Sequence, residues 1–493
     1  MSITAELERI VGPEAVVADK KLLGSFACDL SFVTGKKPSC IARPKRASEV
    51  QEIVRLANAR GIPLVTRSST GERFRGDTVP LSAEAVIMDL SGMDAIIRMD
   101  KRNKVAMIEP GVTFGMLQAA AAQEGLRLAM PLLPRRTKSV LGSYLEREPH
   151  TIPKFHWDMS DPICCLELIF GTGDLFRTGS AAGPGSLEEQ WAAKQAQKSP
   201  MGPSQTDFMK IVQGSQGTMA IATWATVKLE LMPVVQKAFF VPAQNLSELV
   251  DFTYAILRPK LPDECFILNN VDLAAILGSN SEEITSLAKN LPPWILFFAI
   301  AGCEHFPEER VDYIEQDITE IAAHAGVKPV QHLAGIPAMK FLGLLSSPSD
   351  DPYWKLRVRG SCQDIFFLNT LDRAPEFAQE IEKDLRKYTF SKEDLGVYIQ
   401  PIQQGRNCHI EFTLMHAAGD AEATRRVKKL FESSSRTLAD MGGFFSRPYG
   451  IWSKIAYARC PDTIKALRKL KNIFDPHGVL NPGRLCFGKE VRP

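Results

Sequence analysis

The pattern of strands and helices changes near residue 235, and this change constrains the fold more than any other feature of the chain. Before it, short apolar runs alternate with loops that carry glycine and serine, and after it longer strands and helices alternate. At the start, residues 41–63 predict a strand, a helix and the entry to a second strand, since Val50, Ile53 and Ala57 recur at helical spacing. We therefore expect an α+β protein with a domain boundary near residue 235, and not a repeat array.

Apolar patterning predicts the individual elements on both sides of this boundary. The predicted strands are 64–67, 86–90, 96–97, 105–108, 166–170, 175–176, 219–231, 239–241, 266–268, 294–300 and 365–368. The predicted helices after the first are 114–123, 246–257, 307–325, 375–388 and 461–473. Residues 179–204, rich in Ala, Gly, Gln, Ser and Pro, are expected to form a long surface loop.

Size and charge exclude several classes of protein. A chain of 493 residues has room for two or three domains. With 59 Lys and Arg against 57 Asp and Glu, and 45% hydrophobic residues, it is neither disordered nor suited by bulk charge to bind nucleic acid. The longest apolar run, 294–303, is too short to cross a membrane, and the N-terminus lacks the pattern of a secretory signal. We expect a cytoplasmic protein with no membrane span.

The common cofactor and metal motifs are absent from the sequence. Its ten cysteines form no C-x-x-C pair, and no two of its eight histidines lie within four residues of each other. There is no P-loop and no G-x-S-x-G motif, and the glycines Gly171 and Gly173 lack the third glycine and following helix of a dinucleotide fingerprint. We expect no metal site. What remains is the loop Arg67-Ser-Ser-Thr-Gly71, directly after a strand, whose backbone N–H groups and hydroxyls suit a diphosphate.

A series of short motifs in a fixed order carries a resemblance to a known family. Taken in this order, the series resembles FAD-binding oxidoreductases of the vanillyl-alcohol oxidase and 4-cresol dehydrogenase type over about residues 40–233 and 395–485. The motifs are Ile41-Ala-Arg-Pro44, Glu49-Val-Gln-Glu-Ile53, Glu109-Pro-Gly-Val-Thr113, Ser139-Val-Leu-Gly142, Leu145-Glu-Arg147, Leu166-Glu-Leu168, Gly173-Asp-Leu-Phe-Arg-Thr-Gly179, Pro184-Gly-Ser186, Leu231-Met-Pro233 and Phe474-Asp-Pro-His-Gly-Val-Leu-Asn-Pro-Gly483.

The resemblance implies a fold, a cofactor and a set of cofactor-binding residues. The fold is α+β, with a two-part PCMH-type FAD-binding domain (1–233), an antiparallel-sheet cap domain with flanking helices (234–435), and a C-terminal segment that returns to the FAD domain (436–493). The implied cofactor is FAD. Its implied contacts are Arg67, Ser68, Ser69, Thr70, Gly71, Pro131, Ser139, Val140, Gly142, Ser143, Ile221, His409 and Asn481.

The resemblance also implies catalytic residues and leaves the flavin linkage open. His409 matches a cap histidine that bonds covalently to the flavin in some members, and the favoured alternative is that it lies near the flavin without a bond. Arg447 matches an arginine that stabilises an anionic substrate, with Tyr449 as a neighbouring donor, and a guanidinium suits a phenolate or a carboxylate. His156 and Asp158, with His409, are the implied proton acceptors.

Three departures from the family pattern put a phenol pocket in doubt. Phe74 stands where phenol-oxidising members carry a tyrosine, Ser446 replaces their second tyrosine, and Phe155 stands at their acidic residue. A histidine-bearing metal motif, usual in related D-2-hydroxy-acid dehydrogenases, keeps only His409, because Ile402 and Gln403 stand at the earlier positions.

These observations favour one function and leave others open. We expect an FAD-dependent enzyme, a dehydrogenase or an oxidase, that moves a hydride from a small organic, anionic or aromatic, alcohol-type substrate to flavin N5. The sequence leaves open whether the electron acceptor is oxygen, a quinone, a cytochrome or a partner protein, and whether the chain forms a homo-oligomer. The alternatives are a D-2-hydroxy-acid dehydrogenase, an FAD-binding electron-transfer subunit without its own turnover, and a binding protein without flavin.

Overall fold

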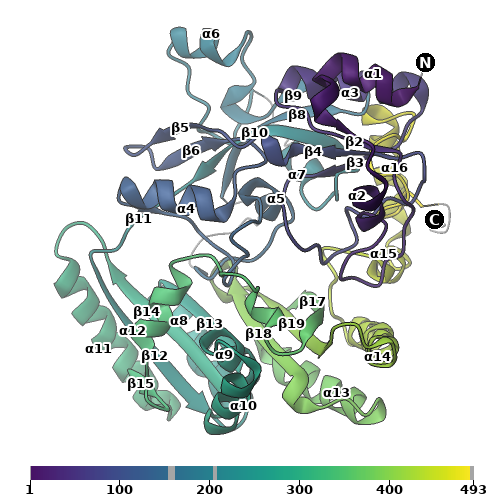
Figure 1. Cartoon of the computed structure of the whole chain (residues 1–493). Helices are drawn as coiled ribbons and strands as arrows, with labels where there is room; N and C mark the ends of the chain where they lie inside the picture. The colour runs from purple at the N-terminus through teal and green to yellow at the C-terminus, as the bar shows by residue number, and fades with distance from the viewer. Residues whose placement is uncertain (1, 154–161, 204–207, 489–493) are drawn as a thin grey trace.

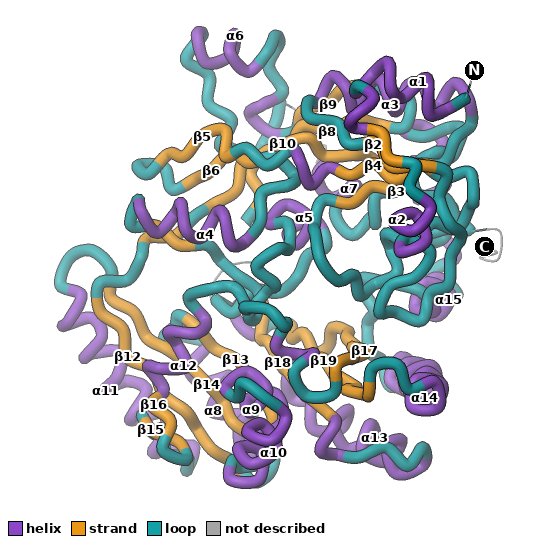
Figure 2. The backbone as a smooth tube through the Cα atoms, in the orientation of Figure 1, coloured by secondary structure: helices purple, strands orange, loops and turns teal. Residues whose placement is uncertain are grey.

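The computed structural model describes residues 2–153, 162–203 and 208–488. Figure 1 shows the N-terminal half of the chain above, a six-stranded sheet with its helices below, and the C-terminal helices returning to the upper half. Figure 2, in the same orientation, shows that long loops fill the region where the upper and lower halves meet. The α+β fold class is therefore confirmed.

A four-stranded sheet begins the upper half, in the order β1-β2-β4-β3. Strands β2 and β3 both run parallel to β4, and α3 connects them with its apolar face on the sheet. Gly61, in the left-handed region at φ 64°, ends α3 as the sequence predicts. The elements are α1 (Ile3–Val11), β1 (Val16–Val17), α2 (Lys20–Ser25), β2 (Cys40–Ala42), α3 (Ala47–Arg60), β3 (Leu64–Arg67) and β4 (Val86–Asp89).

A five-stranded antiparallel sheet, in the order β5-β6-β10-β8-β9, forms the rest of the upper half. Helices α4 and α5 pack on it through a continuous apolar core. The strands are β5 (Ile96–Asp100), β6 (Val105–Ile108), β8 (Ile163–Phe170), β9 (Leu175–Arg177) and β10 (Ala220–Lys228), with β7 (Leu126–Arg127) and β11 (Glu230–Leu231) paired beside them. The helices are α4 (Phe114–Gln123), α5 (Val140–Leu145), α6 (Leu187–Ala192) and α7 (Met209–Val212).

The prediction of one long loop over residues 179–204 is wrong in its centre. Helix α6 forms there and projects from the top of the molecule in Figure 1. A capping box explains it: the Ser186 hydroxyl accepts from the Glu189 N–H, and the Glu189 carboxylate accepts from the Ser186 N–H. Local capping chemistry outweighs the loop-like composition.

The lower half is a six-stranded antiparallel sheet in the order β12-β14-β13-β18-β19-β17. The four predicted strands in this region are confirmed, whereas β18 and β19 were not predicted. Pro401 interrupts the apolar pattern of β18, and His409, Glu411 and Thr413 are polar residues in β19. The strands are β12 (Val235–Ala243), β13 (Glu264–Asn269), β14 (Trp294–Gly302), β17 (Gly360–Asn369), β18 (Leu395–Ile402) and β19 (Asn407–Ala417), and the short pair β15 (His332–Leu333) and β16 (Ile336–Pro337) lies apart.

Helices cover one whole face of this sheet and only part of the other. The fully covered face forms the largest core, with α8 (Ser247–Leu257), α11 (Pro307–Ala325), α13 (Ala374–Lys387) and α14 (Ala421–Asp440). On the other face, α9 (Asn270–Leu277), α10 (Ser281–Asn290) and α12 (Ala338–Leu345) pack over one side only. The uncovered part, over β17, β18 and β19, turns toward the upper half (Figure 1).

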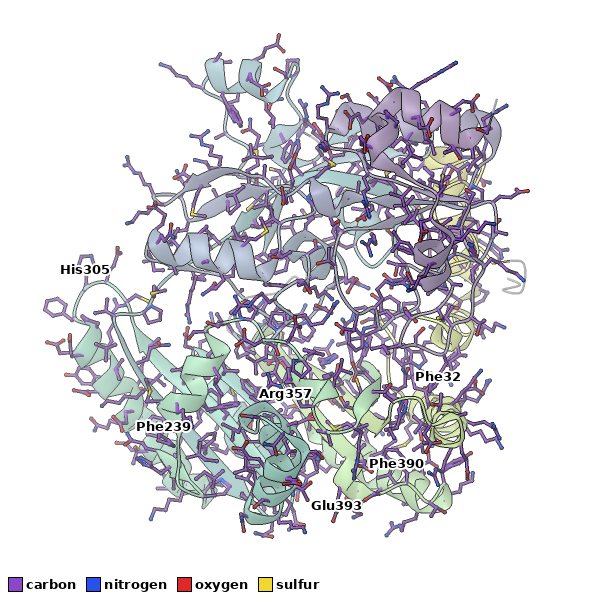
Figure 3. All side chains as sticks on the ribbon, viewed as in Figure 1. Phe32, Phe239, His305, Arg357, Phe390 and Glu393 are labelled. Carbon is purple, nitrogen blue, oxygen red and sulfur yellow. The ribbon has the colours of Figure 1, made fainter. Side chains whose placement is uncertain are left out.

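The C-terminal segment completes the upper half. After α15 (Ile451–Tyr457) and α16 (Pro461–Phe474), Leu480 pairs in parallel with Leu64 of β3, and Phe474 stacks on Phe170 at 4.4 Å between ring centroids. In the opposite direction, Phe32, labelled in Figure 3, reaches from the upper half to Phe431 of α14. None of the helices in the described ranges is long and apolar enough to cross a membrane.

Candidate functional site

The first cavity of interest lies among the turns of the upper half, and we call it the loop cavity. It encloses about 1030 Å³ of space, part of it open to solvent. Main-chain and small side-chain atoms form much of its wall, which suits a ligand that the backbone must approach closely. Its lining includes residues 66–69, 110, 141–142, 214–217, 220–222, 449 and 481.

Six of the residues that the resemblance implied for the cofactor line the loop cavity. They are Arg67, Ser68, Ser69, Gly142, Ile221 and Asn481. The Arg67 guanidinium, however, turns to Asp89, with Nη2 donating to Oδ2 at 2.9 Å, and it therefore fixes the strand end rather than the cavity.

Five other predicted residues belong to the segments that form the cavity wall but do not line the cavity themselves. Thr70 donates its N–H to Thr137 O, Ser139 Oγ donates to Pro110 O, and Ser143 Oγ donates to a carboxylate of the neighbouring loop. Val140 belongs to the apolar core, and Gly71 adopts a positive φ of 77° that permits the turn. None of these five lines the loop cavity or the second cavity described below.

The walls of the loop cavity fit FAD. A Cβ at Gly142 would approach Ser68 Oγ to 3.1 Å, so glycine keeps this wall open. Gln213, next to the 214–217 wall, holds a buried side-chain N–H group that no described residue accepts from. Asn481 Nδ2 donates to Asp77 O at 2.9 Å and to Gln216 O at 2.7 Å, which joins three cavity segments. The donors and the narrow turns match what a dinucleotide with a diphosphate requires.

The second cavity lies between the two halves, and we call it the interface pocket. It holds about 980 Å³ and shares Ser69, Arg73, Asp77, Thr78 and Glu146 with the wall of the loop cavity. Pro131, His409 and Arg447, all predicted site residues, line it. Aromatic residues form another part of the wall: Phe74, Tyr353, Trp354 and Tyr398.

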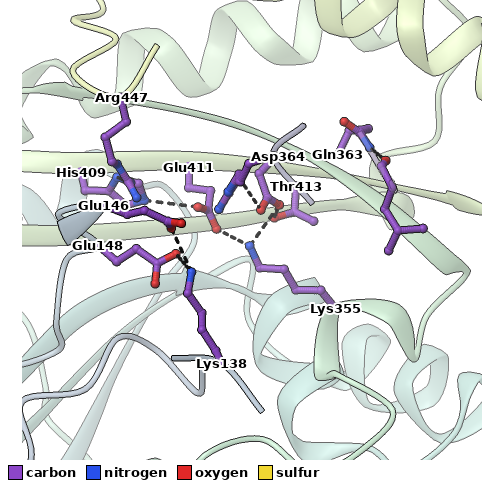
Figure 4. A network of polar contacts seen from close by, with 12 residues as sticks. Lys138, Glu146, Glu148, Lys355, Gln363, Asp364, His409, Glu411, Thr413 and Arg447 are labelled. Atoms are coloured by element: carbon purple, nitrogen blue, oxygen red, sulfur yellow. Dashed lines mark hydrogen bonds and ion pairs between the residues drawn. The ribbon is translucent and has the colours of Figure 1, made fainter. Parts of the chain in front are cut away.

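A buried ion network forms the floor of the interface pocket on the side of the six-stranded sheet. Lys355 Nζ contacts Asp364 Oδ1 at 3.0 Å and Glu411 Oε1 at 2.5 Å, as Figure 4 shows. Thr413 Oγ1 donates to the same Asp364 oxygen at 2.9 Å, and Arg75 reaches Asp364 Oδ2 at 3.3 Å. Alternation along β17 and β19 places these carboxylates on the uncovered face of the sheet.

A second ion cluster faces the pocket from the upper half. Lys138 Nζ contacts Glu148 Oε1 at 2.6 Å and Glu146 Oε2 at 3.0 Å (Figure 4). Ser143 Oγ donates to the other Glu148 oxygen at 2.5 Å. Despite burial, Lys138, Arg447 and Arg75 hold the pKa of Glu148 down at about 2, so this side chain is a carboxylate at neutral pH.

Arg447 and His409 meet between these two clusters. Arg447 Nη2 lies 3.4 Å from His409 Nδ1, and the guanidinium lies over the Phe366 ring at 4.2 Å from its centroid. His409 Nε2 lies 3.3 Å from Glu411 Oε2. Burial lowers the pKa of His409 against the opposing influence of Glu411, which favours the neutral ring. With a carboxylate on one side and an arginine on the other, Nε2 carries the proton and Nδ1 accepts.

The remaining predicted catalytic residues fall in different places. Tyr449 is buried, lines the loop cavity, and burial raises the pKa of its hydroxyl well above the usual range, so it remains a neutral phenol. His156 and Asp158 lie outside the described residues.

Sequence reasoning missed the charged residues of both clusters. The missed residues are Arg75, Lys138, Glu146, Glu148, Lys355, Asp364 and Glu411. The sequence could have indicated two of them. Asp364 directly precedes an apolar strand run and Glu411 interrupts one, and a charge buried in this way requires a partner. The partner Lys355 comes from a turn 56 residues before Glu411, a separation that no local pattern reports.

Comparison with known proteins agrees with this geometry. A family model described as FAD binding domain matches residues 38–179, and one described as the C-terminal domain of FAD linked oxidases matches residues 369–485. The fold and these two domains define an FAD-binding flavoprotein. More particularly, the chain belongs to the FAD-linked oxidoreductases with a PCMH-type FAD-binding domain, and it is an enzyme whose cofactor is FAD.

Relatives and solved structures match nearly the whole chain at low identity. An uncharacterized FAD-linked oxidoreductase of Mycobacterium tuberculosis is 22% identical over 99% of both chains. The flavoprotein subunit of 4-cresol dehydrogenase [hydroxylating] from Pseudomonas putida is 24% identical, covering 91% of this chain and 87% of that one. The structure of 4-ethylphenol oxidase from Gulosibacter chungangensis has a TM-score of 0.82 at 18% identity, covering 99% and 97%. Substrate-bound p-cresol methylhydroxylase has a TM-score of 0.80 at 20% identity, covering 98% and 95%.

Metal-ligating groups do not gather in the part of the chain that the structure describes. No three His, Cys, Asp or Glu side chains there have the arrangement of a metal site. Ile402 and Gln403, at the earlier positions of the metal motif of hydroxy-acid dehydrogenases, supply a hydrocarbon and a neutral amide in place of imidazoles.

Proposed function

We propose that this flavoenzyme removes a hydride from the alcohol-type carbon of a small organic anion, and that Arg447 holds the anionic group. One observation carries the proposal. Arg447 is only 4% exposed, yet no carboxylate of a described residue forms an ion pair with it; its polar contact is the neutral His409 ring. A buried guanidinium that no described carboxylate contacts directly is costly, and an anionic substrate supplies such a contact with paired hydrogen bonds.

The pocket walls support a substrate with an apolar or aromatic body. Phe74 and Tyr353 meet edge to face at 5.7 Å between ring centroids, and Arg135 lies over the Phe74 ring at 5.2 Å. Such a wall buries an apolar surface while the opposite wall holds the anion. FAD, when bound, supplies the hydride acceptor, and the chain positions the substrate and excludes water.

Two substrate classes fit this description. A phenolate is supported by the 4-cresol dehydrogenase relative, and with it membership of the vanillyl-alcohol oxidase group. A 2-hydroxy carboxylate is supported by relatives named D-2-hydroxyglutarate dehydrogenase of Stutzerimonas stutzeri, 23% identical, and D-lactate dehydrogenase of Anaerostipes hadrus, 22% identical. Anaerobic addition of each class of substrate to the holoenzyme separates them, because only a true substrate bleaches the absorbance of the oxidised flavin. A flavin bleached by neither class, but reduced by a partner protein, would indicate an electron-transfer subunit.

Arg447→Met tests the anchor with benzoate, an unreactive aromatic carboxylate, followed by the change in flavin absorbance. Loss of a buried charged partner costs about 2–5 kcal/mol, so we expect benzoate binding to weaken by about 30-fold or more, with partial recovery in Arg447→Lys. Arg459→Met, which removes an exposed arginine paired with Asp440, is the control. Unchanged binding of benzoate to Arg447→Met would contradict the proposal.

The flavin linkage has its own test. Both ring nitrogens of His409 have partners, so a covalent bond through either one displaces Arg447 or Glu411. We propose His409 as the attachment point if the flavin is covalent. Acid precipitation of the holoenzyme decides: yellow colour retained in the wild-type pellet and released in His409→Ala supports the bond, and release from wild type establishes non-covalent FAD.

A further inference from the structure

The junction between the loop cavity and the interface pocket holds a carboxylate to which the function above assigns no role. Glu146, at the end of α5, lines both cavities. If FAD occupies the loop cavity and the substrate occupies the interface pocket, this side chain stands where cofactor and substrate meet. Arg447, by contrast, lines only the interface pocket of these two cavities.

Glu146 keeps one oxygen available at this junction. Its Oε2 contacts Lys138 at 3.0 Å, while within the described ranges no donor contacts Oε1. The neighbouring Glu148 differs, because Lys138 and Ser143 engage both of its oxygens. The Glu146 side chain is 24% exposed and that of Glu148 is 13% exposed. Glu146 therefore combines a fixed orientation with a free lone pair that opens into the cavities.

The charges around Glu146 favour proton uptake. Burial raises the pKa of Glu146, Lys138 opposes this, and the carboxylates of Glu148 and Asp77 add to the rise. Glu146 also adds to the influences that raise the pKa of the Tyr449 hydroxyl, which faces it from the C-terminal segment. A proton on Glu146 leaves Lys138 paired with Glu148, so uptake of the proton takes the net charge of these three side chains from −1 to zero.

The geometry points to Glu146 as the proton acceptor of the reaction, an inference that rests on the proposed function. The substrate C–H bond breaks, and hydrogen leaves with its electron pair to the oxidised flavin. The O–H bond of the same carbon breaks, and its proton goes to Glu146 Oε1. The C–O bond gains the electron pair and becomes a carbonyl, leaving a two-electron-reduced flavin and a protonated Glu146. Of the proton acceptors expected from the sequence, only His409 lies within the described residues, and both of its nitrogens are engaged.

The first test needs no substrate. Charge beside a flavin shifts its absorbance, so a pH titration of the resting wild-type holoenzyme is expected to show a spectral transition above pH about 4.3, the ordinary pKa of a glutamate. The transition is expected to disappear in Glu146→Gln and to return, displaced in pH, in Glu146→Asp. Glu72→Gln, which changes an exposed glutamate near the diphosphate loop, is the control. A transition that persists in Glu146→Gln, or a wild type without one, overturns the inference.

The second test uses a substrate that bleaches the flavin. General-base catalysis contributes about 10²–10⁴-fold, so we expect the reduction rate in Glu146→Gln to fall by that factor and to lose its acid limb, while benzoate binding changes by less than about threefold. An unchanged reduction rate and pH profile would overturn the inference. Failure of benzoate to bind the wild type would instead contradict the Arg447 anchor and leave the spectral titration valid, so the two failures are distinguishable.

Discussion

Asp272, which packs against the six-stranded sheet, is a buried carboxyl group with an unusual protonation state. Its side chain is fully buried on α9, and among the described residues neither carboxylate oxygen has a hydrogen-bond partner. Burial raises the pKa of Asp272 to about 8, with Glu411 and Asp364 adding to the rise and Lys355 opposing it. The side chain is therefore a neutral acid at pH 7, whereas it ionises near pH 4 in the unfolded chain.

This difference makes the stability of the folded protein depend on pH. Between pH 4 and pH 8 the folded state holds a proton that the unfolded state has released, so stability is full below pH 4 and declines as the pH rises toward 8, by at most about 1.4 kcal/mol per pH unit. Asp272→Asn, which cannot ionise, is expected to melt several degrees higher than the wild type at pH 8 and at the same temperature near pH 4. Thermal unfolding at the two pH values measures this, and an equal offset at both would contradict it.

Single residues also show what a sequence can and cannot predict about a site. Motif order was sufficient to select His409 and Arg447, which the structure brings to 3.4 Å. It also selected Thr70 and Val140, which line neither cavity, because a motif reports a segment and not which side chain faces the ligand. The partners of buried charges, such as Lys355 for Glu411, depend on tertiary contacts that no local pattern contains.

At the scale of elements, the contact between β18 and α9 allows no extra atom. A Cβ at Gly396 of β18 would overlap the Asp272 carboxyl of α9. Gly396→Ala is therefore expected to destabilise the protein by about 1–3 kcal/mol, as overpacking of a core does. Shortening the opposing side chain in Asp272→Ser should remove most of that cost, a coupling that a double-mutant cycle of thermal midpoints measures.

A matched control for this contact lies on α12. Gly343 has nothing within 4 Å of its missing Cβ, so Gly343→Ala should be neutral or slightly stabilising. Equal losses from Gly396→Ala in the two backgrounds would show that the clash is not with Asp272.

Elements with a strong apolar period were predicted well, and those at the site were not. The helix predicted over 307–325 has those bounds as α11, because its apolar stripe meets an ordinary core. Strand β19 escaped prediction because its face toward the pocket carries His409, Glu411 and Thr413, where an apolar residue would normally mark a buried position. The polar residues that the site requires thus remove the signal that predicts the strand.

The whole molecule joins sequence-distant segments at one place. We propose residues 1–233, 234–435 and 436–493 as its three units, supported by separate cores in the upper half and the six-stranded sheet. The C-terminal unit reaches the loop cavity through Asn481, which holds carbonyls of Asp77 and Gln216.

Removal of this link should loosen the cofactor. Asn481→Ala leaves two carbonyls of the cavity wall without their hydrogen-bond donor. The loss costs about 1–3 kcal/mol of free energy in total, so we expect FAD to bind at least about fivefold more weakly. His477→Ala, in the same segment but bonded to Asn58 O away from the cavity, is the control. Flavin fluorescence during dilution of the holoenzymes compares the two, and equal retention would contradict the expectation. If the flavin is covalent, reconstitution of the apoprotein gives the same comparison.

The return of the last residues to β3 sets an order of events during synthesis. Leu480 pairs with Leu64, and Asn481 donates to the carbonyls of residues 77 and 216 in the cavity wall. More than 260 residues therefore separate residue 216 from the Asn481 side chain that binds it. A ribosome would still cover Asn481 when every strand of both large sheets has emerged. The loop cavity can therefore close only after residue 481 has emerged, and the newly made chain must keep this site open while the whole six-stranded sheet is being synthesised.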